Sequence, residues 1–305
     1  MTAVLAGVLP VFALIALGYA LKTSRFMPAE TWPPVERLTY FVFYPGFLVP
    51  SIWTAEFGAS AGALGAATVA GVLTVSLAAL LLRPWLRLDG PAFTSVFQGL
   101  TRWNSFVFLP VVALVYGEAA LGAAAVVLGA LIPFVNVTCV LVLARWGEGQ
   151  GGGWRGALAG LLRNPVLWAC AVGLALNASG LRPPGGLDAL LELLAAGALP
   201  LGLLVVGAGL QFTTIAQRPA LVTAVSLAKL LILPALMWGY CRLLGGDAQA
   251  QGLALLCGAA PGAAASYVLA RQMGGDAPLM AAIVAATTVA SVVIIPLLLA
   301  VAHLA

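Results

Sequence analysis

Charge is scarce in this sequence: Asp, Glu, Lys and Arg make up 8% of its 305 residues, whereas soluble domains average about a quarter. Hydrophobic residues make up 62%, and the mean hydropathy is +1.08. A soluble fold of this composition would have too few polar side chains to cover its surface. The sequence therefore predicts an all-α integral membrane protein whose surroundings are the lipid bilayer.

Residues typical of catalysis and metal binding are also few. The only histidine, His303, lies near the C-terminal end, and Cys139, Cys170, Cys241 and Cys257 stand alone within apolar runs. This spacing offers neither a disulfide framework nor a zinc site, and no GxSxG or HExxH motif occurs. We therefore expect no enzyme, no cofactor and no metal. The net charge of +4 forms no basic stripe, so nucleic acid is not an expected partner.

Long apolar stretches recur along the chain, each about 20 residues in length, which is what a helix needs to cross a bilayer core. The connections between them are short, and the longest polar connection is 146–156. No segment is left that could form a separate soluble domain. We expect ten transmembrane helices, at roughly 2–21, 36–55, 60–82, 92–116, 119–144, 156–179, 188–211, 219–241, 249–271 and 278–303.

Lysine and arginine are spread unevenly over the connections. Positive charges follow the first apolar run instead of preceding it, which predicts a retained first helix with its N-terminus outside. With that orientation only Arg182 and Arg242 lie in outer loops. The bias predicts a multi-pass protein of the cell membrane with both termini outside. The basic residues of the inner loops are Lys22, Arg25, Arg37, Arg83, Arg87, Arg145, Arg155, Arg163, Arg218 and Arg271.

The two halves of the chain resemble each other. At an offset of 155 residues, 10–28 lies over 165–183, and at an offset of 158, Gly117-Glu118 lies over Gly275-Asp276. The third pair of spans aligns ambiguously. Because five spans per half is an odd number, the halves must face opposite ways, which is the inverted repeat of many secondary transporters. The expected units are 1–146, a cytoplasmic linker at 147–155, and 156–305.

Spans four and nine are interrupted near their midpoints. Span four contains Asn104 and Pro110, and span nine contains Pro261 followed by Gly262. Proline removes a backbone donor and glycine weakens a helix, so we expect the helices to break and cross here. Each break then leaves free N–H groups on one half-helix and free carbonyls on the other, and the N-terminal end carries a partial positive charge that suits a carboxylate.

Arg102 and Lys229 are the only charged residues deep within predicted spans, and all ten acidic residues fall in loops or at span ends. Each cation either meets an anionic substrate or is held by backbone carbonyls of the broken helices. The missing buried acid disfavours sodium/proton antiport. Gln98, Asn136, Thr288 and Ser291 are further polar candidates for the cavity wall. The predicted substrate-binding residues are Asn104, Arg102, Pro261, Gly262, Lys229, Ser266, Tyr267 and Thr287.

Several longer motifs resemble the auxin efflux carrier family, in its bacterial branch of organic-anion permeases. The resemblance covers nearly the whole chain. Its more specific parts are Arg-x-Asn followed by a proline, and Ala-Ala-Pro leading to Ser-Tyr-Val-Leu-Ala. The segments are LPVFALIALGYALKTSRFM (9–27), RLTYFVFYPGFLVPSI (37–52), TRWNSFVFLPVVALVYGEAAL (101–121), SLAKLLILPAL (226–236) and AAPGAAASYVLARQMGG (259–275).

The resemblance implies ten helices in two inverted repeats, with crossing broken helices in spans four and nine, as in the bile-acid-symporter and sodium/proton-antiporter architectures. Spans 1, 2, 6 and 7 would form a scaffold, and spans 3–5 and 8–10 a mobile transport domain that works as an elevator. A homodimer joined through the scaffold is also implied. The expected function is secondary transport of a small mono- or dicarboxylate. A sodium-coupled carrier of bile-acid-symporter type, or a membrane sensor that binds an anion without moving it, are the alternatives.

Overall fold

The computed structural model describes residues 2–55, 60–148, 162–181, 186–212 and 218–302, and every regular element among them is helical. Most of the predicted linker and the start of predicted span six lie outside the described residues. The first half contains α1 (Thr2–Thr23), α2 (Trp32–Leu38), a π-helical turn η2 (Thr39–Phe43), α3 (Tyr44–Trp53), α4 (Ala61–Leu86), α5 (Gly90–Thr101), α6 (Ser105–Tyr116) and α7 (Leu121–Trp146). The second half contains α9 (Pro165–Ser179), α10 (Leu187–Gly209), α11 (Pro219–Leu227), a π-helical turn η5 (Ala228–Ile232), α12 (Leu233–Leu243), α13 (Ala248–Ala259), α14 (Ala265–Met273) and α15 (Ala277–Ala302).

The length and composition of these helices agree with an integral membrane protein. Within the described residues, six helical stretches are long and apolar enough to cross a bilayer, and Leu9–Thr23 of α1 and Pro165–Ser179 (α9) are shorter apolar stretches. The predicted all-α membrane class is therefore confirmed. The six long stretches are Ala61–Leu86, Gly90–Tyr116, Glu118–Trp146, Leu187–Gly209, Pro219–Leu243 and Ala277–Ala300.

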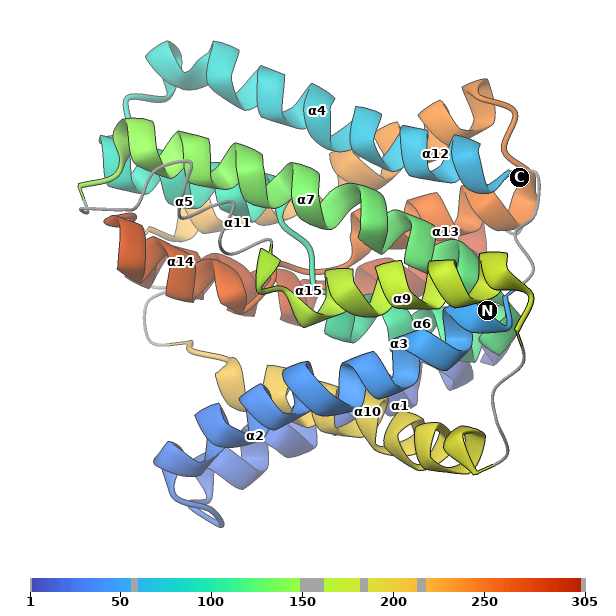
Figure 1. Ribbon diagram of the computed structural model, residues 1–305. Coiled ribbons are helices and arrows are strands. Elements are labelled where there is room, and N and C mark those ends of the chain that lie inside the picture. The colour runs from blue at the N-terminus through green and yellow to red at the C-terminus, as the bar shows by residue number, and fades with distance from the viewer. Residues whose placement is uncertain (1, 56–59, 149–161, 182–185, 213–217, 303–305) are drawn as a thin grey trace.

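The helices form two groups that differ in their partners. In the first group, α1 packs against α10, and α3 packs against both α9 and α10. In the second group, α4 packs against α7 and α12, and α15 packs against α5, α11, α13 and α14. Figure 1 shows α4 at one edge of the molecule and α1, α2 and α10 at the opposite edge. Contacts of α6 and α15 with α1, and of α7 with α9, join the two groups.

Two of the spans are each broken into a pair of short helices, α5 with α6 and α13 with α14. The chain leaves α5 after Thr101, is extended at Arg102 and Asn104, and enters α6 at Ser105. Between α13 and α14 it is non-helical at 260–263. The side-chain oxygen of Asn104 accepts the N–H of Phe106 at 3.0 Å and so caps α6. Such a cap satisfies a donor that a helix start leaves free, which explains why the chain resumes its helix here.

Pro110 does not interrupt a helix. It lies inside α6, which continues unbroken to Tyr116. Pro110 removes one backbone hydrogen bond from α6, but membrane helices tolerate such a loss without ending. The expected break at Pro110 is therefore corrected to the three residues Arg102, Trp103 and Asn104.

Candidate functional site

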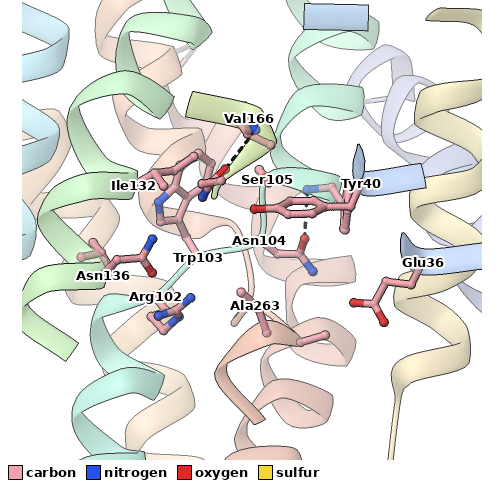
Figure 2. A pocket seen from close by; sticks show the side chains of 15 residues that line it. Glu36, Tyr40, Arg102, Trp103, Asn104, Ser105, Ile132, Asn136, Val166 and Ala263 are labelled. Atoms are coloured by element: carbon pink, nitrogen blue, oxygen red, sulfur yellow. Dashed lines mark hydrogen bonds between the residues drawn. The ribbon is translucent and has the colours of Figure 1, made fainter. Parts of the chain in front are cut away.

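A cavity of about 210 Å³ lies where the two interrupted spans meet. Its wall comes from α2 and η2, from the break between α5 and α6, from α7, from the start of α9, and from the start of α14. Figure 2 shows the side chains gathered around it. The lining residues are Glu36, Tyr40, Arg102, Trp103, Asn104, Ser105, Phe106, Ile132, Val135, Asn136, Asn164, Val166, Ala263, Ala264 and Ala265.

Two of the predicted binding residues, Arg102 and Asn104, lie on this wall. Asn104 is 3% exposed, and its Oδ1 is used to cap α6. Its Nδ2, like Nη1 of Arg102, is buried and makes no hydrogen bond to any described residue. A buried donor without a partner is costly, about 1–3 kcal/mol or more when charged. Both groups are therefore available to a ligand with acceptor oxygens.

The residues of span nine that line the cavity differ from the predicted ones. The cavity is lined by Ala263, Ala264 and Ala265, whereas Pro261 and Gly262 are buried behind it. Ser266 is fully buried, lines no described cavity, and has a hydroxyl oxygen without a hydrogen-bond partner among the described residues. Small side chains at 263–265 leave the backbone at the start of α14 accessible from the cavity.

Thr287 on α15 supports this segment from behind. The N–H of Gly262 donates to its Oγ1 at 3.0 Å, and the hydroxyl donates to the carbonyl of Ile283 at 2.7 Å. Thr287 is fully buried and is not part of the cavity wall. Its role in the structure is to fix the backbone of the break, which differs from the direct substrate contact predicted.

Lys229 is far more buried than a lysine normally is, with 0% of its surface exposed. Its ammonium group donates to the carbonyl of Gly258 at 3.0 Å, in the last turn of α13. A cation at a helix C-terminus is favoured by the partial negative charge of the free carbonyls. Of the two alternatives open for Lys229, the structure favours the one in which backbone carbonyls hold it, and Lys229 does not line the cavity.

Several polar residues of the wall were not among the predicted binding residues. Tyr40 and Glu36 come from the beginning of predicted span two, and Asn164 precedes α9, which it caps through the N–H of Val166 at 2.9 Å. Asn136, one of the further polar candidates, also lies on the wall, whereas Gln98 does not. An acidic residue at a span end gave no signal in the sequence. Only the packing of α2 toward the break brings Glu36 here.

A second cavity, of about 240 Å³, adjoins the first, since Glu36 and Ala264 line both. It also contains Tyr267, a predicted binding residue, and Lys22. The ammonium group of Lys22 donates to the carbonyl of Ala208 at 2.6 Å. The predicted site residues thus separate into Arg102 and Asn104 at the first cavity, Tyr267 at the second, and Pro261, Gly262, Ser266, Thr287 and Lys229 outside both.

Comparison with known proteins identifies the class of molecule. Residues 155–299 match a family described as "membrane transport protein". The chain is also 27% identical, over 295 residues that cover 95% of both sequences, to an uncharacterized transporter of Methanothermobacter thermautotrophicus. The resemblance predicted from the sequence is confirmed. The second half of the chain thus matches a membrane transport protein family that is auxin efflux carrier-like, and together with the apolar helices these matches indicate a multi-pass membrane transporter.

Proposed function

We propose that this transporter is a secondary carrier of a small mono- or dicarboxylate, which binds at the crossing of the two interrupted spans. The observation that carries the proposal is the pair of buried donors, Arg102 Nη1 and Asn104 Nδ2, that lack partners among the described residues and belong to one cavity. The starts of α6 and α14 line the same cavity. Their partial positive charges add to the attraction for a carboxylate.

The proposed architecture is ten spans in two inverted repeats, and the helix bounds support it. An offset of 158 residues takes α5, at 90–101, onto α13, at 248–259. The same offset takes α4, at 61–86, onto 219–244, and the continuous stretch of α11, η5 and α12 ends at residue 243. The third pair of spans, which the sequence aligns ambiguously, thus has a consistent partner.

Helix caps repeat with the same offset. Asp89 Oδ1 accepts the N–H of Ala92 at 2.8 Å, and Asp247 Oδ1 accepts the N–H of Ala250 at 2.8 Å. In addition, Arg218 lies 3.9 Å from the carboxylate of Asp89, while Ser60 donates to that of Asp247 at 2.9 Å. Residues 60 and 218 are also 158 apart, so each half repeats the same contact with the other half. Two related halves allow inward-open and outward-open states of similar energy.

The two helix groups support an elevator-type movement. In this proposal α1, α3, α9 and α10 form the scaffold, and the broken helices travel with α4, α7, α12 and α15 as the transport domain. The helices of each group pack against one another, which would let the second group move as a unit. A homodimer through the scaffold, a cell-membrane location and termini outside remain part of the proposal. In this orientation Lys22 faces the inside, so the second cavity would connect the site to the cytoplasm.

Ligand-induced thermal stabilisation of the purified protein tests the proposed site. A panel of mono- and dicarboxylates is screened against the wild type, Arg102→Ala and Asn104→Ser. Serine retains a capping oxygen but removes the free Nδ2 donor, so this variant separates binding from the stability of α6. Arg242→Ala, at an exposed position away from the cavity, is the matched control.

We expect a carboxylate to raise the unfolding temperature of the wild type and of the control. It should raise the unfolding temperature of the two site variants much less. Full stabilisation of both site variants would contradict the site. The screen is repeated with and without sodium, because sodium-dependent stabilisation would favour the bile-acid-symporter type. Binding without flux in proteoliposomes would favour the sensor.

A further inference from the structure

The first cavity contains one side chain of each charge sign, Arg102 and Glu36. Figure 2 shows them on opposite sides of Asn104 and Ala263, with the Glu36 carboxylate extending toward the middle of the site. The salt bridges formed within the described residues join Arg218 to Asp89 and to Asp276, and neither cavity charge takes part in them. The two charges are therefore held apart in one cavity rather than neutralising each other.

The Arg102 side is suited to a carboxylate. Arg102 Nη1 and Asn104 Nδ2 are both donors, both buried and both without a partner among the described residues. Hydrogen bonds between a guanidinium and a carboxylate are among the strongest in proteins. The two oxygens of a carboxylate offer one acceptor to each of these donors.

The Glu36 side is suited to a positive group. Glu36 is half-buried and contributes to both cavities. The other charged group of the second cavity, Lys22, already donates to the carbonyl of Ala208. A second carboxylate on the ligand would meet the like charge of Glu36 in a site where water screens poorly, and an ammonium group would be attracted there.

We propose that the substrate is an amino-carboxylate, such as a small amino acid, with its carboxylate at Arg102 and Asn104 and its ammonium group at Glu36. The inference rests on the proposed carboxylate site and narrows its substrate class. The charges of Arg102 and Glu36 sum to zero, so a zwitterion leaves the cavity neutral, whereas a dicarboxylate adds two negative charges. A cavity of about 210 Å³ is small, which favours short chains.

Isothermal titration of the full-length purified protein tests the inference with matched ligands. Alanine and β-alanine are compared with propionate, and γ-aminobutyrate with butyrate, because each pair differs chiefly in the ammonium group. The variant is Glu36→Gln, which keeps the size and removes the charge. The control is Glu30→Gln, since Glu30 is exposed and lines neither cavity.

We expect at least one amino-carboxylate to bind the wild type tenfold or more tightly than its partner without nitrogen. Glu36→Gln should remove most of this preference without weakening propionate or butyrate binding, because a like charge is taken out of the cavity, and Glu30→Gln should change neither. Equal affinity within every pair, or a preference that survives in Glu36→Gln, overturns the inference while leaving the carboxylate site intact. If no carboxylate binds, with or without an ammonium group, the proposed function fails together with the inference.

Discussion

Lys22 and Asn177 lie 155 residues apart and make equivalent hydrogen bonds. Lys22 Nζ donates to the carbonyl of Ala208 at 2.6 Å, and Asn177 Nδ2 donates to the carbonyl of Trp53 at 2.9 Å. Residues 53 and 208 are also 155 apart. Each side chain ends the first helix of its own half and binds the last carbonyls of the second helix of the other half, which a helix leaves unsatisfied.

Removing either donor should destabilise the helix group formed by α1, α3, α9 and α10. We expect Asn177→Ala to lower the free energy of unfolding by about 1–3 kcal/mol, because the hydrogen bonds from Asn177 to three carbonyls are lost. Lys22→Met, which keeps the apolar stem, should cost about 1–2 kcal/mol. Thermal unfolding in detergent measures both. Ser24→Ala is the control, since its exposed hydroxyl bonds only its own turn, and an equal loss in this control would contradict the assignment.

Gly18 and Gly173 are related by the same offset, and both lie where these helices approach each other closely. A methyl group at Gly18 would overlap the backbone of Leu204, and one at Gly173 would lie 2.8 Å from Ile52 Cβ. We expect Gly18→Ala to destabilise by about 1–3 kcal/mol, because backbone cannot move aside as a side chain can. Gly239→Ala, with no atom within 4 Å, should be neutral or stabilising. Melting temperatures that fall equally in both variants would refute this prediction.

The hydrogen bond between Thr287 and Gly262 should position the break of span nine. Thr287→Val is expected to cost about 1–3 kcal/mol, because the buried N–H of Gly262 loses its acceptor. Ligand affinity should fall as well, since the start of α14 borders the cavity. Thr287→Ser keeps the hydroxyl and should retain affinity. Titration of both variants with the best ligand of the screen checks this, and equal affinity of the valine and serine variants would contradict it.

The orientation can be tested with single introduced cysteines, because all four native cysteines are buried. Leu244 follows α12 on the predicted outer side, and Arg87 ends α4 on the predicted inner side. In intact cells, a membrane-impermeant maleimide should label Leu244→Cys. It should label Arg87→Cys only after the membrane is permeabilised. The reverse pattern would invert the proposed topology.

Much of the fold could be predicted from the sequence, because the length of an apolar run is set directly by the thickness of a bilayer. The breaks near Asn104 and Pro261 carried a local signal as well, since an amide cap, proline and glycine act on their own helix. Pro110 does not mark a break, because a membrane helix can absorb a proline and continue, as α6 does to Tyr116.

The composition of the site was harder to predict, since it depends on contacts between distant segments. Glu36 stands at a span end in the sequence, and only the packing of the second span against the crossing brings it to the cavity. Lys229 looked like a binding cation by depth alone, yet its partner is the carbonyl of Gly258, 29 residues away. Depth in the bilayer indicates that a charge needs a partner, but not which partner it has.

Uptake of a labelled carboxylate into proteoliposomes is the most direct test of the central claim, that a carboxylate crosses the membrane bound to Arg102 and Asn104. The ligand is the one that best stabilises the wild type, and the proteins are the wild type, Arg102→Ala, Asn104→Ser and Arg242→Ala. We predict saturable uptake by the wild type and by Arg242→Ala, and at least a tenfold loss in the other two. Undiminished uptake by both Arg102→Ala and Asn104→Ser would contradict the account.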